Sequence, residues 1–197
     1  MLSWDAREDA RLVKRCRAGE KEAFAALVER YEDAVYNICY RMVGDREEAR
    51  DLAQEAFVRA YEGLGGFRAG MPFRAWLFRI ATNASIDHLR RRARKPEVAR
   101  VSADGAELDE KSRAAEVRAV GRVPGPEETA LASEVTRAVH GALAELPDNY
   151  RAAVVLYHLE GMSFAEVGSV LCVPRNTAKT WAHRGRAALA ASLEGVI

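Results

Sequence analysis

Aromatic and cationic side chains alternate over a short stretch of the chain. Phe67, Phe73, Trp76 and Phe78 stand among Arg68, Arg74 and Arg79. Flat rings stack on bases and cations neutralise phosphates, so this composition is typical of a surface that binds single-stranded nucleic acid. Five more cations follow within residues 88–95, with no acid among them: Arg90, Arg91, Arg92, Arg94 and Lys95. The stretch fits equally well an amphipathic core helix with a solvated basic end, and other parts of the chain have to decide between the two.

A second stretch, residues 161–193, has the spacing of a helix-turn-helix. Ser163 and Glu166 have the spacing of a capping box and predict a short helix that ends near Leu171. A three-residue turn, 172–174, leads to a second helix expected from about Asn176 to about Leu193. One side of that helix is apolar or small, with Ala178, Trp181, Ala182, Gly185 and Leu189. The other side carries Asn176, Lys179, Thr180, His183 and Arg184.

The polar side of this second helix suits the major groove of duplex DNA. Lysine and arginine can reach guanine acceptors, and asparagine can bind an adenine edge. Residues 174–186 hold four Lys or Arg and no acid, so phosphates would not be repelled. An ordinary helical hairpin with a solvated cationic face is the alternative, but capping, turn and polarity together favour DNA binding.

Helices are expected to position both stretches. Apolar residues recur at spacings of three and four within 5–18, 22–42, 45–64 and 73–92, and loops between these segments are short. Asp45 and Glu48 predict a capping box at the start of the third segment. Residues 96–129 are rich in Ala, Gly, Ser, Pro and Glu and predict a flexible linker. We therefore expect an all-α protein: an N-terminal extension (1–21), a helical bundle (22–95), the linker (96–129) and a helix-turn-helix domain (130–194).

The charges of the chain are distributed unevenly along it. Of 197 residues, 49% are apolar and 30% are charged, and the net charge is +1, so any attraction to nucleic acid must be local. Residues 1–95 carry 19 Lys or Arg against 15 Asp or Glu, a net charge of +4. Residues 96–130 have a net charge of −3, and residues 131–197 have none.

Other functional classes find little support in the sequence. Cys16, Cys39 and Cys172 are far apart, which argues against disulfides or a zinc site and predicts small buried residues in a reducing compartment. The four histidines lie on separate predicted helices, and no phosphate-binding glycine loop occurs. No stretch is long and apolar enough for a membrane span or a leader. We expect a cytoplasmic protein with no enzyme activity, cofactor, metal or membrane insertion.

Three longer sequence segments resemble bacterial RNA polymerase sigma factors of the extracytoplasmic-function (ECF) group of the sigma-70 family. AFAALVERYEDAVYNICYRMVGDREEARDLAQEAFVRAYEGL is similar to the polymerase-binding half of sigma region 2. FRAGMPFRAWLFRIATNASIDHLRRRAR is similar to its half that melts and recognises the −10 element. ALAELPDNYRAAVVLYHLEGMSFAEVGSVLCVPRNTAKTWAHRGRAAL is similar to sigma region 4, which recognises the −35 element. The match spans most of residues 22–190 apart from the linker.

The resemblance implies a role for each of three sets of residues. Single-stranded −10 DNA and its backbone would be bound by Phe67, Arg68, Phe73, Trp76, Arg79, Asn83, Arg90, Arg91 and Arg94. The −35 duplex would be bound by Arg175, Asn176, Thr177, Lys179, Thr180, His183 and Arg184. Polymerase would be bound by Asp51, Gln54 and Glu55. Carboxylates that face a basic partner contribute specificity and association rate more than affinity.

The implied partners are core RNA polymerase, through the clamp helices of its largest subunit and the flap of its second largest, promoter DNA and an anti-sigma factor. The linker, acidic at net −3, would run through the positively lined interior of the polymerase. The chain departs from the family pattern P-x-G-T-V-K-S-R-x-x-R-A-R, since it reads PRNTAKTWAHRGR. Asn176, Ala178, Trp181 and Gly185 replace Gly, Val, Arg and Ala, and EVG at 166–168 replaces EIA. The −35 preference of the family therefore does not transfer, and Arg175 is a candidate substitute for the arginine missing at 181.

Two readings from other classes stay open on the sequence alone. A freestanding helix-turn-helix regulator would use residues 22–95 as an effector or dimerisation domain and would bind duplex DNA without polymerase. Alternatively, residues 1–95 would be only a protein-interaction module, such as a decoy for an anti-sigma factor. Co-purification with polymerase, followed by binding to single-stranded −10 oligonucleotides, separates the three readings.

Overall fold

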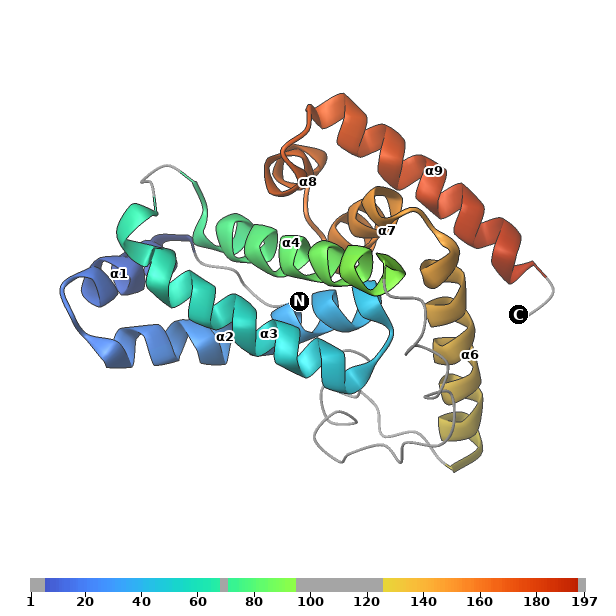
Figure 1. Ribbon diagram of the computed structural model, residues 1–197, viewed down its shortest axis with the longest axis horizontal. Helices are drawn as coiled ribbons and strands as arrows, with labels where there is room; N and C mark the ends of the chain where they lie inside the picture. Colours follow the sequence, from blue (N-terminus) through green and yellow to red (C-terminus); the bar gives the residue numbers. More distant parts are fainter. Residues whose placement is uncertain (1–5, 68–70, 95–125, 195–197) are drawn as a thin grey trace.

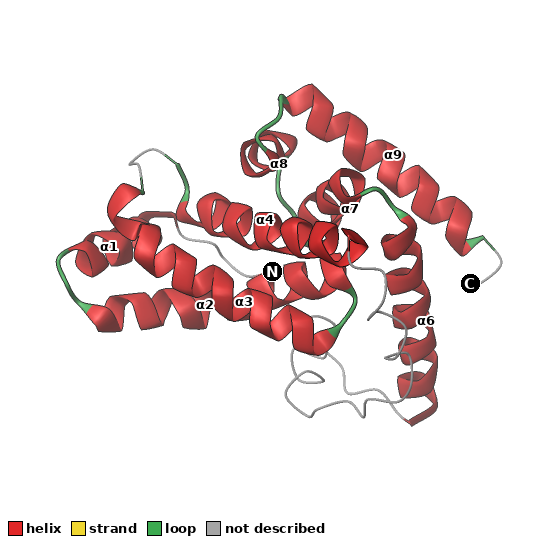
Figure 2. Cartoon of the chain, in the orientation of Figure 1, coloured by secondary structure: helices red, strands yellow, loops and turns green. Residues whose placement is uncertain are grey.

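The computed structural model describes residues 6–67, 71–94 and 126–194, with side chains from 135 onward in the last range. Every regular element within these ranges is a helix (Figure 2). The helices form two units that pack against each other (Figure 1). We refer to residues 6–94 as the first unit and residues 126–194 as the second unit. The all-α, two-unit architecture predicted from the sequence is confirmed.

The first unit is a bundle of α1 (Ala6–Arg17), α2 (Lys21–Val43), α3 (Arg46–Gly63) and α4 (Phe73–Arg94). The helices α2, α3 and α4 pack pairwise, and α1 lies mainly on α2. Apolar residues spaced by three and four put one face of α2 in the core, where Leu27, Tyr31, Val35 and Ile38 are fully buried. Gly44 ends α2 as expected, at φ 79°, and its N–H donates to the carbonyl oxygen of Tyr40.

A buried carboxylate fastens α1 to the bundle. Asp9 is 3% exposed and accepts hydrogen bonds from Arg30 Nη1 at 2.7 Å and from the Tyr31 hydroxyl at 2.5 Å. Burial, together with the Asp9 carboxylate, raises the pKa of Tyr31, so this hydroxyl stays a donor. A buried charge requires such partners, because an unpaired one costs several kcal/mol. The amphipathic pattern of α1 did not indicate that an acid on its inner side would be paired.

The start of α3 differs in part from expectation. Asp45 is the N-cap and accepts a hydrogen bond from the backbone N–H of Glu48 at 2.9 Å. The reciprocal bond of a capping box is replaced, because the Glu48 carboxylate reaches α4 instead, where it lies 3.1 Å from His88 Nε2 and 3.2 Å from Arg92 Nη1. The His88 and Arg92 side chains of a neighbouring helix compete with the local backbone N–H for the same carboxylate.

The second unit contains α6 (Pro126–Glu145), α7 (Asp148–Val154) with a π-helical continuation (Val155–Leu159), α8 (Phe164–Leu171) and α9 (Arg175–Leu193). Helix α6 begins at Pro126, earlier than the expected start near Ala130. Proline is tolerated at the first position of a helix, because an N–H there would have no partner within the helix. The capping box at the start of α8 is confirmed, because Ser163 and Glu166 each accept a hydrogen bond from the other's backbone N–H. The remainder of the predicted linker lies outside the described residues.

Two glycines let the helices of the second unit approach closely. A Cβ on Gly168 would lie 2.8 Å from the carbonyl oxygen of Val173, in the turn between α8 and α9. A Cβ on Gly185 would lie 2.5 Å from Val154 Cγ2 and 3.2 Å from the carbonyl oxygen of Tyr150 on α7. Both positions depart from the alanine of the family pattern. Both glycines that replace this alanine therefore stand where two segments of the chain pack too closely for a Cβ.

Polar contacts join the two units where α8 packs on α4 and where α6 and α7 meet the end of α2 (Figure 1). Arg74 of α4 donates to the carbonyl oxygen of Glu160. The Tyr40 ring and the His140 imidazole lie 4.2 Å apart between their centroids. Burial lowers the pKa of His140 to about 4, and Arg41 and Arg46 lower it further, so the imidazole is neutral at pH 7.

Candidate nucleic-acid and partner-binding surfaces

One exposed face of α4 collects most of the residues predicted to bind single-stranded DNA. Spacings of three, four and seven place Trp76, Arg79, Asn83, Arg90 and Arg94 on the same side of the helix. We call these five residues the α4 strip. Asn83, Arg90 and Arg94 are exposed, while Trp76 and Arg79 are half-buried. The opposite side of α4 faces the core and α8, so the second unit docks without covering the strip.

The aromatic part of the prediction needs correction. Phe67 is 8% exposed and Phe73 is 3% exposed, so neither ring offers a free face to a base. Both rings pack against Trp76, with centroids 5.0 Å and 5.8 Å from the indole. Their contribution to the surface is therefore to hold Trp76, the half-exposed aromatic of the strip, in place. Sequence composition alone does not separate rings that stack on bases from rings that stack on each other.

An arginine that sequence reasoning missed positions the backbone before α4. Arg17, at the end of α1, donates to the carbonyl oxygens of Leu64, Gly65 and Phe67 at 3.2, 2.6 and 3.0 Å. These carbonyls follow α3, where unsatisfied acceptors and the helix dipole favour a cation. Arg17 thereby holds the backbone at the start of the connection between α3 and α4. Arg68, predicted in the same loop, lies outside the described residues.

The arginines at the end of α4 divide into two groups. Arg90, Arg91 and Arg94 line a hollow of about 380 Å³ together with Arg59 of α3 and Asp87. Arg92 points to the other side, towards Glu48. The predicted phosphate-binding residues are thus brought together, and Arg59 joins them from a different helix.

Helix α9 carries the residues predicted to bind the −35 duplex, and its polar side is open. Arg175, Asn176, Lys179, Thr180, His183 and Arg184 are exposed, and Thr177 is half-buried. Ala178, Ala182 and Gly185 are buried on the opposite side, as predicted. Thr180 donates its hydroxyl to the carbonyl oxygen of Asn176 at 2.9 Å, which leaves that hydroxyl only as an acceptor for an outside donor. Helix α9 runs along the outer side of the second unit, away from the first (Figure 1).

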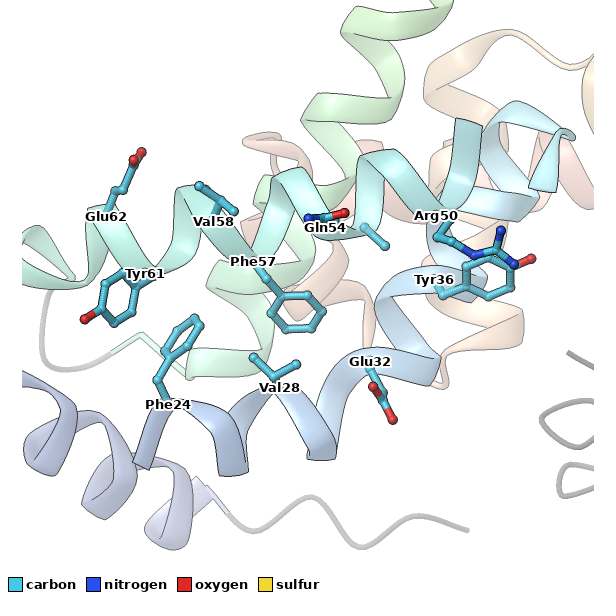
Figure 3. A pocket seen from close by; sticks show the side chains of 11 residues that line it. Phe24, Val28, Glu32, Tyr36, Arg50, Gln54, Phe57, Val58, Tyr61 and Glu62 are labelled. Atoms are coloured by element: carbon cyan, nitrogen blue, oxygen red, sulfur yellow. The ribbon is translucent and has the colours of Figure 1, made fainter. Parts of the chain in front are cut away.

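A groove between α2 and α3 forms a mainly apolar recess with a volume of about 540 Å³. Phe24 and Val28 of α2 and Phe57 of α3 point into it (Figure 3). Val58 and Tyr61 are 50% and 48% exposed, which is unusual for apolar side chains of this size. We call this recess the α2–α3 groove. It was not predicted, although Val58 and Tyr61 lie off the buried stripe of α3.

The residues predicted to bind polymerase lie beside this groove. Gln54 lines it, and Asp51 is exposed one turn earlier on the same helix. Glu55 is half-buried and pairs with Arg59 at 2.5 Å, four residues on. The three side chains therefore share the outer side of α3 with the exposed apolar residues. An apolar centre with a polar rim is typical of a protein-binding surface.

The cysteines do not indicate a further functional site. Cys16, Cys39 and Cys172 are free thiols, and burial raises the pKa of Cys39 to about 12. Cys172 contradicts the prediction of a buried residue, because it is exposed at φ 56° in the turn before α9. Among the described side chains no group of three His, Cys or acidic residues is placed to hold a metal ion. No helix in the described ranges has the length and hydropathy to cross a membrane.

An exposed strip with an aromatic ring and arginines, a helix-turn-helix with an open polar side and an apolar groove are features expected of a two-part DNA-binding protein. Family models agree, since residues 27–95 match Sigma-70 region 2 and residues 136–189 match Sigma-70, region 4. The chain belongs to the sigma-70 family of RNA polymerase sigma factors, in its extracytoplasmic-function group.

Relatives match over nearly the whole chain. ECF RNA polymerase sigma factor SigW of Bacillus subtilis is 38% identical over 177 residues, 90% of this chain and 92% of SigW. RNA polymerase sigma-H factor of Pseudomonas aeruginosa is 35% identical over 190 residues, 96% of each chain. Among solved structures, CnrH in complex with the cytosolic domain of CnrY has a TM-score of 0.67 and 28% identity over 96% of this chain and 98% of CnrH.

Proposed function

We propose that this chain binds core RNA polymerase through the outer side of α2 and α3, captures the unstacked −10 strand on the α4 strip and recognises the −35 duplex with α9. The observation that carries the proposal is the common exposed face of Trp76, Arg79, Asn83, Arg90 and Arg94. Base contacts from Trp76 and Asn83 would lie next to phosphate contacts from the arginines. Such a surface favours the separated strand over the duplex, because stacking on an aromatic side chain contributes about 1–3 kcal/mol per base.

The α2–α3 groove supports the polymerase part of the proposal. Phe57, Val58 and Tyr61 supply an apolar centre, and Asp51, Gln54 and Glu55 supply a polar rim on the same helix. The clamp helices of the largest polymerase subunit are the proposed occupant. Apolar side chains would provide most of the affinity, and the carboxylates would orient a basic partner. Contact of the second unit with the flap of the second-largest subunit rests on family resemblance.

Helix α9 supports the proposal for duplex DNA. Lys179, His183 and Arg184 lie on its open side and have the length to reach base edges in a major groove. Arg175 and Asn176 stand at its N-terminus, where backbone N–H groups also favour a phosphate. The neutral Asn176 and Trp181 replace the glycine and arginine of the family pattern. We therefore propose a −35 preference distinct from that of the family pattern.

Action would be by binding alone, in the cytoplasm, with no chemical step. Opening the duplex costs a few kcal/mol for each base step that is unstacked, and contacts to the extruded bases offset this cost. CnrH was solved with the cytosolic domain of CnrY, which supports a regulatory protein, such as an anti-sigma factor, as a partner of this chain too.

Reconstituted transcription tests the proposal. Purified chain mixed with core polymerase and fragments of its host genome should give transcripts with defined start sites, whereas core polymerase alone should not. Absence of specific transcripts on every fragment would overturn it. A freestanding regulator would instead bind duplex DNA without polymerase, and a decoy would bind a regulatory protein but not polymerase, so pull-down with core polymerase separates both from the proposal.

A further inference from the structure

The hollow at the end of the α4 strip gathers four arginines from two helices. Arg90, Arg91 and Arg94 come from α4, and Arg59 comes from α3, 31 positions before Arg90 in the numbering. Among the described residues, Asp87 is the acid that lines it. Arg90 Nη1 lies 4.0 Å from Asp87 Oδ1, and Arg91 Nε donates to the Asp87 carbonyl oxygen at 3.4 Å. The described lining residues thus comprise four guanidinium groups and one carboxylate, so the hollow carries an excess of positive charge.

The position of the hollow indicates what it binds. Asp87 lies one turn after Asn83 on the same side of α4, so the hollow continues the strip on which we place unstacked bases. A strand whose bases lie on the strip must carry its phosphates onwards over the helix end. Guanidinium groups match phosphate oxygens with two parallel hydrogen bonds, which makes arginine the suitable residue type here.

Arg59 has an ion-pair partner on its own helix, α3. Its Nη2 lies 2.5 Å from Oε1 of Glu55, one turn earlier on α3. Glu55 belongs to the side of α3 on which we place polymerase. Side chains four apart on an exposed helix hold each other only weakly, so a phosphate can compete with Glu55 for Arg59.

We propose that Arg59 is a phosphate-binding residue that completes this hollow, and that Glu55 sets how strongly it binds. The proposal rests on the proposed function for the identity of the strand. It adds a residue from the polymerase-facing helix to the DNA surface. A partner that binds Glu55 on the outer side of α3 frees Arg59 and so strengthens binding of the strand. Binding at the outer side of α3 and binding in the hollow therefore favour each other.

Salt dependence of strand binding tests the role of Arg59. The full chain is titrated against a fluorescein-labelled oligothymidine, and affinity is measured by anisotropy over a range of salt concentrations. A single phosphate contact contributes about 0.7 to the slope of log K against log salt. Arg59→Gln should therefore lower the slope by about 0.7 and the affinity near 0.1 M salt by about fivefold. Arg11→Gln, which removes an exposed arginine of α1, is the matched control and should leave both unchanged.

A double-mutant cycle tests the role of Glu55. Glu55→Gln should raise the affinity by about twofold, the weight of one exposed helical ion pair. Glu47→Gln, which removes an exposed acid paired with Arg50 on the same helix, should leave it unchanged. In the Arg59→Gln background, Glu55→Gln should have no effect, because its partner is absent.

The outcomes separate this proposal from the proposed function. An unchanged slope for Arg59→Gln, or the same gain from Glu55→Gln in both backgrounds, overturns the role of the pair, even where promoter-specific transcription succeeds. If transcription fails but the slope and the cycle behave as stated, the hollow binds phosphate and the proposed function is wrong. Circular dichroism of each variant confirms that the comparison is between folded chains.

Discussion

Arg151 of α7 donates from Nη1 to the carbonyl oxygen of Met42, 109 residues earlier, at the C-terminal end of α2. Its Nη2 donates to the carbonyl oxygens of Ala144 and Leu146 at 2.8 and 3.1 Å. One buried guanidinium therefore satisfies acceptors from both units. Helix ends need such donors, because their last carbonyls have no partner within the helix.

Removal of Arg151 should loosen the contact between the units. Arg151→Ala leaves three carbonyl oxygens without this donor, and we expect the free energy of unfolding to fall by about 1.5–3 kcal/mol. Urea denaturation followed by circular dichroism measures the loss. Arg137→Ala, an exposed arginine of α6, is the control and should change stability by less than about 0.5 kcal/mol. Equal effects of the two substitutions would contradict the structural role of Arg151.

Gly185 should not tolerate the alanine of the family pattern. A Cβ there would meet Val154 Cγ2 at 2.5 Å and backbone at 3.2 Å, so Gly185→Ala should destabilise the chain by about 1–3 kcal/mol. Gly141 is the control, since a Cβ there meets nothing within 4 Å. Gly141→Ala should stabilise α6 by about 0.5–1 kcal/mol, the ordinary preference of a helix for alanine. Thermal denaturation measures the stability of both variants. A stabilised Gly185→Ala variant would refute the close contact.

Glu160 should make the stability of the chain depend on pH. Burial raises the pKa of its carboxyl to about 7, although Arg41 and Arg74 act to lower it. In the unfolded chain the pKa is about 4.3. The folded state thus holds the proton more tightly, and stability that is fully present below pH 4.3 is lost as the pH rises to about 7.

Glu160→Gln removes this dependence. Below about pH 4, the free energies of unfolding of the variant and the parent chain should differ by a constant amount. Between about pH 4 and pH 8, the variant should gain roughly 1–3 kcal/mol in free energy of unfolding relative to the parent. Urea denaturation at a series of pH values measures the difference. A difference that stays constant with pH would show that the carboxyl titrates normally in the folded chain.

A charge in the α2–α3 groove should weaken polymerase binding without unfolding the chain. Val58 is 50% exposed, so Val58→Glu should change stability by less than about 0.5 kcal/mol. The new carboxylate would be buried on binding, and affinity for core polymerase should fall at least about tenfold, or 1.4 kcal/mol. Ala25→Glu adds the same charge to an exposed position of α2 outside the groove. Surface plasmon resonance with immobilised core polymerase should separate the two variants, and equal binding would exclude the groove.

Asn83 and Lys179 should affect different forms of DNA. Asn83→Ala should weaken binding of the single-stranded −10 sequence about tenfold and leave the −35 duplex unaffected, and Lys179→Ala should do the reverse. The two probes are taken from start sites mapped by run-off transcription. Anisotropy titrations of each variant with each probe give the answer. Loss on both probes by either variant would disprove the division between α4 and α9.

Local signals in the sequence predicted the helices and their ends well. Gly44 and the Ser163 capping box act over a few residues, so neighbouring letters suffice to recognise them. Glu48 is the instructive exception. A reciprocal bond from its side chain to Asp45 was predicted, but the carboxylate lies against His88 and Arg92, which follow 40 and 44 residues later on another helix. Tertiary contacts of this kind have no periodic signature.

The candidate site was predicted as a set of residues but not as a surface. Periodicity places Asn83, Arg90 and Arg94 on one side of α4, yet it cannot tell that Phe67 and Phe73 turn inward to support Trp76. Arg17 and Arg59 act on the site from other helices, so only the folded chain brings them there. The α2–α3 groove likewise exists only between two packed helices.

Gly168 and Gly185 bring α8, α9 and α7 so close that no added carbon fits between them without displacement. On the exposed side of α9, Arg184 donates to the Tyr150 hydroxyl at 3.4 Å, and the His183 ring lies 5.8 Å from that of Phe164. Asn176, Lys179 and Thr180 are exposed, so they can change at less cost to the scaffold than His183 and Arg184. A lineage, or a protein engineer, can retarget the second unit to a new promoter by exchanging those side chains alone, while the two glycines keep the helix in the orientation that the new contacts need.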